Sequence, residues 1–163
     1  MSEATARKAV IPASTGVCFG TPPWLYNFFN RRFAFTLDPC PLNDAAIWDG
    51  LARSWRGERV FCNPPYGRKE IPRWLAKRFE PDVALYLLPA RTDTEWWHDI
   101  VLLEAAEIVF IRNRICFVGM SAPAYFANVA VLFEREPRTP VIKRLWLTDL
   151  EPTRGYRLPP DPA

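Results

Sequence analysis

Hydrophobic residues recur along the chain first at helical and then at strand-like spacing. Apolar side chains at helical intervals follow Thr21-Pro22-Pro23, so we expect a short helix over 22–30 with Thr21 as its N-cap. A second apolar stripe predicts a helix over 71–79, and the capping-box pattern from Thr92 to Glu95 predicts a third through about residue 104. Shorter apolar runs predict strands at 17–19, 33–38, 59–62, 83–88, 107–111, 115–117, 127–133 and 142–147. The segment 41–58 reads as a loop with a helical turn near 49–55.

Strands that alternate with helices predict an α/β fold with a mostly parallel central sheet flanked by helices. The chain shows no internal repeat or linker, so we expect a single domain over 19–148, a flexible N-terminal arm over 1–18 and a disordered tail over 149–163. In such folds ligands bind beyond the carboxyl ends of the strands. Asp38-Pro39-Cys40 and Asn63-Pro64-Pro65-Tyr66 each follow such an end, which predicts a site there.

Composition narrows the class of protein. The 163 residues are 49% hydrophobic and 24% charged, which excludes a wholly disordered chain. No stretch approaches the roughly 20 apolar residues of a membrane span, and no leader pattern opens the chain, so we expect a cytoplasmic protein. Only four of the 21 basic residues are lysines, and arginine suits phosphate contacts, although a GC-rich genome explains this usage equally well.

The four cysteines do not form a recognisable framework. Cys18, Cys40, Cys62 and Cys116 are far apart, and His98 is the only histidine that could join them around a metal. We therefore expect buried free thiols and no metal site.

The segment from Asn63 to Gly67 is the most informative in the chain. Two prolines stiffen it and remove backbone donors, so the Asn63 side-chain oxygen and the Pro64 carbonyl form a pair of fixed acceptors beside the Tyr66 ring. Such a set suits a planar group that carries an NH2. The alternative is a proline-rich turn in which Tyr66 only packs, and acceptor oxygens turned inward and already paired would favour it.

These residues resemble a known family. Asn63-Pro64-Pro65-Tyr66 after a buried strand is similar to the catalytic motif of S-adenosylmethionine-dependent amino-methyltransferases, and residues 21 to about 133 resemble the phage-type, Dam-like DNA N6-adenine methyltransferases. The matching pieces, in the family's order, are Thr21-Pro22, Phe35 to Asp38, Asp49-Gly50-Leu51 with Trp55, Asn63 to Gly67, Trp74 with Lys77, Leu87 to His98, Ile111 to Phe117 and Ala122-Pro123.

The resemblance implies an abbreviated Rossmann-like methyltransferase fold that acts on DNA adenine, flipped out or single-stranded, in a bacterium or a phage-infected host. The catalytic residues would be Asn63, Pro64, Pro65 and Tyr66, with Tyr66 stacked on the base. The cofactor would be S-adenosyl-L-methionine, held by Asp38 and more weakly by Asp49. Further cofactor contacts would come from Thr21, Pro22 and Cys40. Asp38 could instead simply cap the following turn.

A second group of candidates follows the strand predicted at 83–88. Arg91 has no local structural explanation, so a phosphate or target-base contact is plausible, whereas Thr92, Asp93 and His98 each have structural explanations. Because a helix cannot bury adjacent tryptophans equally, we expect one of Trp96 and Trp97 in the core and the other over the pocket, with Trp97 assigned to the substrate. Arg112 and Arg114 could contact the DNA backbone, or belong to a solvated loop.

Departures from the family pattern keep other functions open. The turn after Asp38 lacks the usual glycines, and only 25 positions separate Asp38 from Asn63, so the cofactor half must be shortened. The same fold could methylate RNA, cytosine N4 or a protein glutamine. A nucleic-acid-binding protein without cofactor, or an interaction protein with exposed prolines, are the alternatives from other classes.

Overall fold

A computed structural model of the chain describes residues 19–42, 49–135 and 140–146. The N-terminal arm predicted over 1–18 and the tail predicted over 149–163 lie outside these residues, as do residues 17 and 18 of the first predicted strand and the end of the last.

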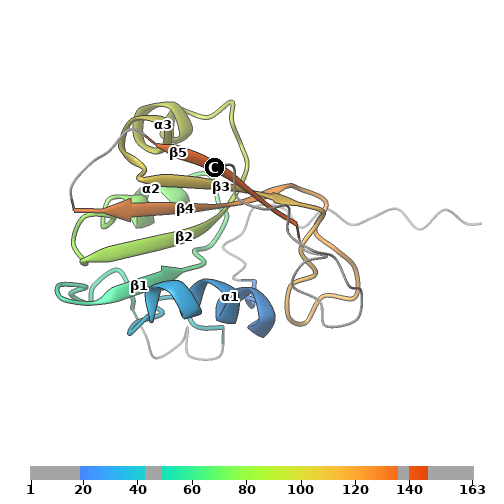
Figure 1. Cartoon of the computed structure of the whole chain (residues 1–163), viewed down its shortest axis with the longest axis horizontal. Coiled ribbons are helices and arrows are strands. Elements are labelled where there is room, and N and C mark those ends of the chain that lie inside the picture. The colour runs from blue at the N-terminus through green and yellow to red at the C-terminus, as the bar shows by residue number, and fades with distance from the viewer. Residues whose placement is uncertain (1–18, 43–48, 136–139, 147–163) are drawn as a thin grey trace, which may run out of the picture.

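The described residues form one five-stranded sheet (Figure 1). Its strands are β1 (Arg59–Cys62), β2 (Val83–Pro89), β3 (Glu107–Arg112), β4 (Asn128–Glu134) and β5 (Val141–Trp146), in the order β1-β2-β4-β3-β5. β1 pairs with β2 and β3 with β5 in parallel, whereas β4 is antiparallel to both β2 and β3. The sheet is therefore mixed, and the prediction of a mostly parallel sheet is wrong. Residues 113–127 return the chain from β3 to β4 without a crossover helix, and such a return gives an antiparallel pair.

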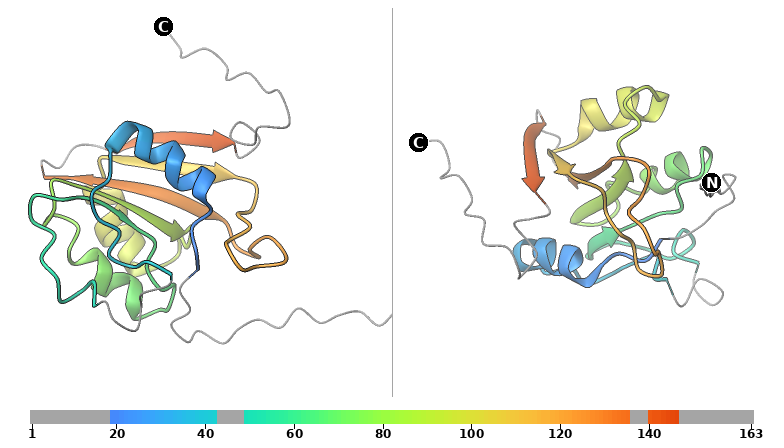
Figure 2. Two further views of the ribbon diagram at one scale, coloured as in Figure 1. Left: turned by 90° about the horizontal axis from the view of Figure 1, so that it is seen from below. Right: turned by 90° about the vertical axis from the view of Figure 1, so that its right-hand side faces the viewer.

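Helices cover both faces of this sheet (Figure 2). On one face lies α1 (Pro23–Phe33), whose Leu25 and Phe29 pack on Phe61 and Leu85. On the other lie α2 (Glu70–Leu75) and the π-helical turn η1 (Trp97–Val101), which continues into α3 (Leu102–Glu104). Alternate strand residues point to opposite faces, so the two hydrophobic clusters follow from the period-two geometry of the strands.

The predicted strand at 33–38 is wrong. Phe33 ends α1, Ala34 adopts a left-handed conformation with φ of 47°, and the Phe35 amide donates to Asn30 Oδ1 at 2.7 Å. Only Leu37 then reaches the sheet, in an isolated parallel bridge to Val60. The chain thus runs beside β1 without forming a strand.

Two predicted helix starts are also wrong. Pro22, not Thr21, occupies the N-cap position of α1, and the Thr21 hydroxyl instead accepts from Asn63 Nδ2. Helical geometry after β2 begins at Glu95, and Thr94 rather than Thr92 precedes it, with the Thr94 hydroxyl donating to the Arg91 carbonyl at 2.8 Å.

Three smaller expectations need correction. Residues 115–117 form no strand, although Val118 bridges Gly20. α2 ends at Leu75 and continues only as turns. Cys62 is buried as expected, but Cys40 is half-buried and Cys116 is exposed.

Candidate active site

The segment from Asn63 to Gly67, here called the elbow, lies at the carboxyl edge of the sheet. It follows β1 directly, and Ala90-Arg91 follows the parallel strand β2 at the same edge. Because β4 is reversed, its first residue, Asn128, also lies there, opposite Pro89. The bridge between Leu37 and Val60 brings Asp38 to this edge as well.

The Asn63 side chain is held by the segment that precedes α1. It is only 2% exposed, and its Nδ2 donates to the Phe19 carbonyl at 2.6 Å and to the Thr21 hydroxyl at 3.0 Å. A carbonyl can only accept, so the amide nitrogen must face Phe19. This fixes Asn63 Oδ1 on the opposite side, where the Tyr66 hydroxyl donates to it at 2.7 Å.

Tyr66 is enclosed by aromatic side chains. It is 5% exposed, and its ring centroid lies 5.5 Å from that of Phe19, 6.2 Å from that of Phe117 and 5.5 Å from that of Phe126. Burial raises the pKa of its phenol well above the usual value, so the hydroxyl stays protonated and remains a hydrogen-bond donor. The ring has no open face for a base in this structure.

Asn128 extends the hydrogen-bond chain, and the sequence did not single it out. Its Nδ2 donates to the Tyr66 hydroxyl and to the Leu88 carbonyl, both at 3.4 Å. It is 1% exposed, and no described residue donates to its Oδ1. In the sequence, the only feature that marks Asn128 is its position as a polar residue directly before the apolar run of β4.

The elbow is therefore closed, which corrects the expectation of two outward-facing acceptors. For Asn63 Oδ1 the structure agrees with the alternative, a proline-rich turn in which Tyr66 packs. Asn63 Oδ1 points inward and is paired, whereas none of the described residues donates to the Pro64 carbonyl oxygen. A carbonyl oxygen has two lone pairs, so Asn63 retains one further accepting position. An amine can reach it only if the Tyr66 ring or its aromatic neighbours move.

The predicted cofactor residues gather beside the elbow. Asp38 Oδ1 accepts from the Cys40 amide at 2.9 Å, which is the contact expected if Asp38 caps the following turn. Burial raises the pKa of the Asp38 carboxyl to about 6. A Cβ on Gly50 would lie 1.8 Å from the Pro39 carbonyl oxygen, so only glycine allows this approach. The close packing brings the turn that begins at Asp49 onto the segment 38–40.

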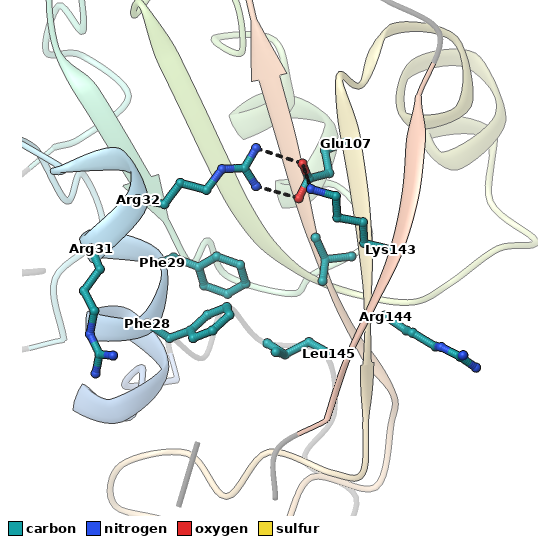
Figure 3. Close-up of a pocket in the computed structure, with 9 residues that line it drawn as sticks. Phe28, Phe29, Arg31, Arg32, Glu107, Lys143, Arg144 and Leu145 are labelled. Atoms are coloured by element: carbon teal, nitrogen blue, oxygen red, sulfur yellow. Dashed lines mark hydrogen bonds and ion pairs between the residues drawn. The ribbon is translucent and has the colours of Figure 1, made fainter. Parts of the chain in front are cut away.

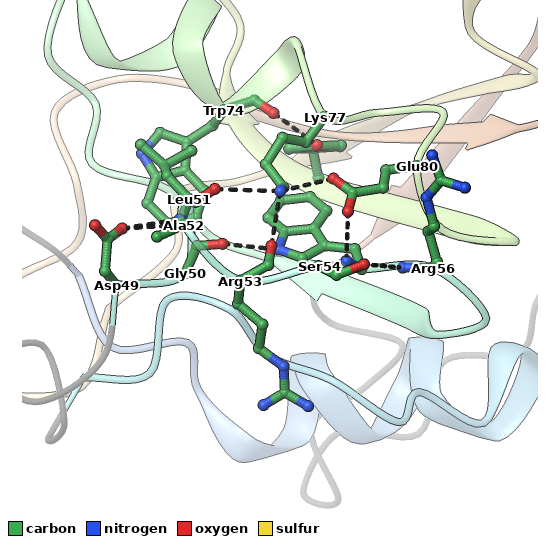
Figure 4. A network of polar contacts seen from close by, with 12 residues as sticks. Asp49, Gly50, Leu51, Ala52, Arg53, Ser54, Arg56, Trp74, Lys77 and Glu80 are labelled. Atoms are coloured by element: carbon green, nitrogen blue, oxygen red, sulfur yellow. Dashed lines mark hydrogen bonds and ion pairs between the residues drawn. The ribbon is translucent and has the colours of Figure 1, made fainter.

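Asp49 itself has a structural role in that turn. Its carboxylate is exposed and accepts from the Leu51 amide at 3.0 Å and the Ala52 amide at 3.2 Å. Lys77 Nζ donates to the carbonyls of Leu51 and Arg53, at 3.2 and 2.7 Å, and pairs with Glu80 (Figure 4). Lys77 thus holds the Asp49 turn in place from the side of the sheet on which α2 lies.

Trp55 completes this anchor. Its indole Nε1 donates to the Gly50 carbonyl at 2.8 Å, its backbone amide donates to Glu80, and Lys77 lies 5.1 Å from its ring centroid. These contacts give a physical reason for the Trp55 and Lys77 pieces of the family pattern.

A polar cleft of about 440 Å³ opens beside the elbow. Arg91 lines it and donates to the Tyr66 carbonyl at 3.1 Å, which leaves further guanidinium donors facing the cleft. The cleft is lined by Arg68, Pro72, Arg91, Asp93, Thr94, Glu95 and Trp96.

The remaining substrate candidates lie at different depths. Trp97 is 3% exposed and Trp96 7%, so the expectation that the two are buried unequally is wrong. Of the two, Trp96 lines the polar cleft, and Trp97, which we assigned to the substrate, does not. A π-helical turn holds more residues than an α-helical turn, so adjacent side chains point in more similar directions. Arg114 is exposed on the loop that carries Phe117 and Phe126, and His98 Nε2 is hydrogen-bonded to the Thr92 carbonyl.

Residues 19–42, 49–135 and 140–146 contain no group of three His, Cys, Asp or Glu side chains that could hold a metal ion. The same residues contain no helix that is long and apolar enough to cross a bilayer.

The described residues form a mixed α/β sheet with the elbow at its carboxyl edge, which is consistent with a methyltransferase-like α/β fold. Comparison with family models identifies the family: the model described as DNA N-6-adenine-methyltransferase (Dam) matches residues 8–139. The chain belongs to this family. Comparisons with curated proteins and with solved structures return no match.

Proposed function

We propose that this protein transfers a methyl group from S-adenosylmethionine to the N6 amine of adenine in DNA. The observation that carries the proposal is the family match over residues 8–139, which includes the elbow. The placement of the elbow next to Asp38 and Arg91 supports it.

The elbow supplies the means to activate the amine. The N6 lone pair of adenine is delocalised into the ring, so the amine is a poor nucleophile. Asn63 Oδ1 and the Pro64 carbonyl would accept hydrogen bonds from its two N–H groups and stabilise the positive charge that develops on nitrogen in the transition state. As the nitrogen bonds to the methyl carbon, the carbon–sulfur bond of the sulfonium breaks, and the nitrogen then loses one of its protons to solvent.

Access to the elbow requires Tyr66 to move. Its hydroxyl occupies one accepting position of Asn63, and Phe19 and Phe126, both half-buried, cover its ring. When these aromatics shift, the Tyr66 ring becomes available to stack on an adenine, a contact worth about 1–3 kcal/mol. A base inside a duplex cannot reach this depth, so the target must be flipped out or single-stranded.

The residues beside the elbow fit the cofactor. Burial disfavours the ionised form of the Asp38 carboxyl and so raises its pKa. A bound cation, or a ribose hydroxyl that donates to the carboxylate, would stabilise that ionised form. Thr21, Pro22 and Cys40 lie on the segments next to it, and Gly50 keeps the Asp49 turn close. When bound, the cofactor supplies an electrophilic methyl group on a sulfonium cation.

The test is to incubate unmethylated DNA with methyl-labelled cofactor and to separate the nucleosides. We expect label in N6-methyladenine. Label in N4-methylcytosine, or label only in RNA or protein offered in parallel, would contradict the assignment of substrate.

A protein that only docks nucleic acid is distinguished by calorimetry. The proposed enzyme binds S-adenosylmethionine with measurable heat, and a docking protein does not.

A further inference from the structure

Asn63, Glu107 and Asn128 are the amide and carboxylate side chains that are buried in the described part of the chain. Glu107 has partners for both of its oxygens. They accept from the two guanidinium nitrogens of Arg32, at 2.9 and 3.0 Å, and Lys143 adds a contact at 3.0 Å (Figure 3). Asn63 likewise uses both its nitrogen and its oxygen. Asn128 differs from both of these residues.

The side chain of Asn128 is incompletely hydrogen-bonded. Its Nδ2 makes two long contacts, both of 3.4 Å, with the Tyr66 hydroxyl and the Leu88 carbonyl. Its Oδ1 has no partner among the described residues, and the other buried side-chain atom without one is Trp74 Nε1, which can only donate. Asn128 Oδ1 is therefore the unpaired acceptor among the buried side chains that the structure describes.

An unpaired buried acceptor calls for a physical reason, because it lowers the stability of the fold. A purely structural link between Tyr66 and Leu88 uses the amide nitrogen of Asn128 and leaves its oxygen unexplained. The position of Asn128 next to the Tyr66 hydroxyl suggests a reason that involves the elbow.

The Tyr66 hydroxyl lies between two amides. It donates to Asn63 Oδ1 at 2.7 Å, and Asn128 Nδ2 lies on it at 3.4 Å. A hydroxyl carries one hydrogen, so it donates to one acceptor at a time. A half-turn of the Asn128 amide about its Cβ–Cγ bond exchanges Nδ2 and Oδ1, which are of similar size. The Tyr66 hydroxyl then has a second acceptor within reach.

The proposed reaction needs such a second acceptor. The target amine must donate to Asn63 Oδ1, so the Tyr66 hydroxyl has to release that oxygen. Burial raises the pKa of the Tyr66 phenol well above its usual value, so the released hydroxyl keeps its hydrogen. In a buried site, a donor without an acceptor opposes the movement that opens the elbow.

We propose that Asn128 is a positioning residue that accepts the Tyr66 hydroxyl when the target amine takes its place on Asn63 Oδ1. The inference rests on the proposed function, because that function supplies the amine. Asn128 itself does not touch the substrate in this scheme. The structural alternative is a water molecule bound to Asn128 Oδ1, which would leave the methylation rate independent of Asn128.

The test is a double-mutant cycle on the single-turnover rate of methyl transfer, at saturating cofactor and DNA. In Asn128→Ala the released hydroxyl has no acceptor, so we expect the rate to fall about tenfold. In Tyr66→Phe there is no hydroxyl to accept, so adding Asn128→Ala should change the rate by less than about twofold.

Val129→Ala is the matched control. Val129 is the next residue of β4 and is fully buried, but it packs in the cluster on the opposite face of the sheet from Tyr66. The control should lose stability and keep the wild-type rate. Asn128→Asp keeps an oxygen for the Tyr66 hydroxyl in either protonation state, so its rate should stay within about threefold of the wild type.

Two outcomes of the cycle would overturn the inference. One is an Asn128→Ala protein that folds and keeps the wild-type rate. The other is a loss of the same size in the Tyr66→Phe background, because Asn128 would then act on the fold and not through the Tyr66 hydroxyl.

NMR of the wild type tests the same exchange without a variant and without catalysis. Proton–nitrogen spectra record the side-chain amide of Asn128. Without cofactor, single-stranded DNA that contains one adenine should shift this signal. The same strand with purine in place of adenine, which lacks the N6 amine, should leave it unshifted. Equal shifts with both strands, or none with either, would overturn the inference.

The NMR measurement also separates this inference from the proposed function. A wild type that shows the adenine-dependent shift of Asn128 but methylates no DNA would sustain the inference and contradict the proposed function. A wild type that methylates adenine without that shift would do the reverse.

Discussion

At the scale of single residues, the site is a directional chain of hydrogen bonds between two backbone carbonyls. Asn63 donates to Phe19, Tyr66 donates to Asn63, and Asn128 donates to both Tyr66 and Leu88. Each amide orientation follows from the carbonyl it must face, so the polarity of the chain is fixed. The consequence is that Asn63 Oδ1 carries a phenol donor where the proposed reaction needs an amine.

Tyr66→Phe separates the hydroxyl from the ring. We expect it to lower the free energy of unfolding by about 1–2 kcal/mol, because Asn63 and Asn128 lose a buried partner. The methylation rate should be retained, because the stacking ring remains and the hydroxyl only blocks the Asn63 oxygen.

Chemical denaturation and steady-state methylation measure the two effects, with the exposed Tyr125→Phe as the matched control. A loss of rate comparable to that of Tyr66→Ala would show that the hydroxyl itself takes part in the reaction.

The proposed contact of Asp38 with the cofactor predicts that cofactor binding depends on pH. Its pKa in the free protein is about 6, raised by burial, and a cationic or diol ligand prefers the ionised form. The dissociation constant of S-adenosylmethionine should therefore be constant above pH 7 and rise about tenfold for each unit below 6. Calorimetry between pH 5 and 8 measures this, and Asp38→Asn should bind weakly without pH dependence.

The raised pKa of Asp38 also affects the stability of the fold, and ionisation, which favours cofactor binding, here lowers stability. Because the folded state disfavours the carboxylate, Asp38 costs stability as pH rises through 6, so Asp38→Asn should be more stable than the wild type at pH 8 and little changed at pH 4. Asp82→Asn, at an exposed position, serves as the control for charge. For the binding prediction, a wild-type affinity for S-adenosylmethionine that does not change between pH 5 and 8 would show that Asp38 is not part of the cofactor site.

At the scale of elements, the turn after Asp49 is positioned by packing. Gly50 lies against the Pro39 carbonyl, and Lys77, Trp55 and Glu80 hold the turn from the other side. In the proposed cofactor half, which is short, this contact would take the place of the glycine-rich turn that the sequence lacks.

Gly50→Ala should therefore disrupt both the turn and cofactor binding, since its Cβ would need the Pro39 backbone to move. Gly57→Ala is the control: its φ is 76° but no atom lies within 4 Å, so we expect only a strain cost of about 1 kcal/mol. Thermal unfolding and calorimetry with S-adenosylmethionine compare the two. Equal affinity in both variants would show that the Asp49 turn does not contribute to the cofactor site.

Local sequence determined some elements and not others. The runs at 60–62 and 83–88 are continuous and apolar, and both lie in strands of the structure. The run at 33–38 also begins with apolar residues, but the hydrogen bond from the Phe35 amide to Asn30 turns the chain after Phe33, and residue spacing does not reveal that contact. The direction of β4 depends on how residues 113–127 return, which hydrophobic pattern also leaves open.

The same division applies to the site. The elbow and Arg91 stand out locally because of prolines and of an arginine without a structural explanation. Asn128, Phe19 and Phe126 come from distant parts of the chain and meet Tyr66 only in the fold. The spacing of these three residues in the sequence does not indicate that they contact Tyr66.

At the scale of the whole molecule, the residues proposed to carry out the reaction lie at one edge of a single sheet, and the surfaces around that edge would bind the DNA. The polar cleft that Arg91 lines lies next to the elbow, at the end of β2. The described residues hold no second domain that could read sequence. Discrimination among DNA targets would therefore have to come from this cleft and from the loops around the elbow.

The most direct test of the central claim is the single-turnover rate of methyl transfer to adenine by Asn63→Ala, at saturating cofactor and DNA. We expect a loss of about 100- to 1,000-fold, the usual effect of removing one group that stabilises transition-state charge. Calorimetry should show that the variant still binds S-adenosylmethionine, and Asn27→Ala, at an exposed position of α1, should keep the wild-type rate. A folded, cofactor-binding Asn63→Ala protein that methylates adenine at the wild-type rate would contradict the account.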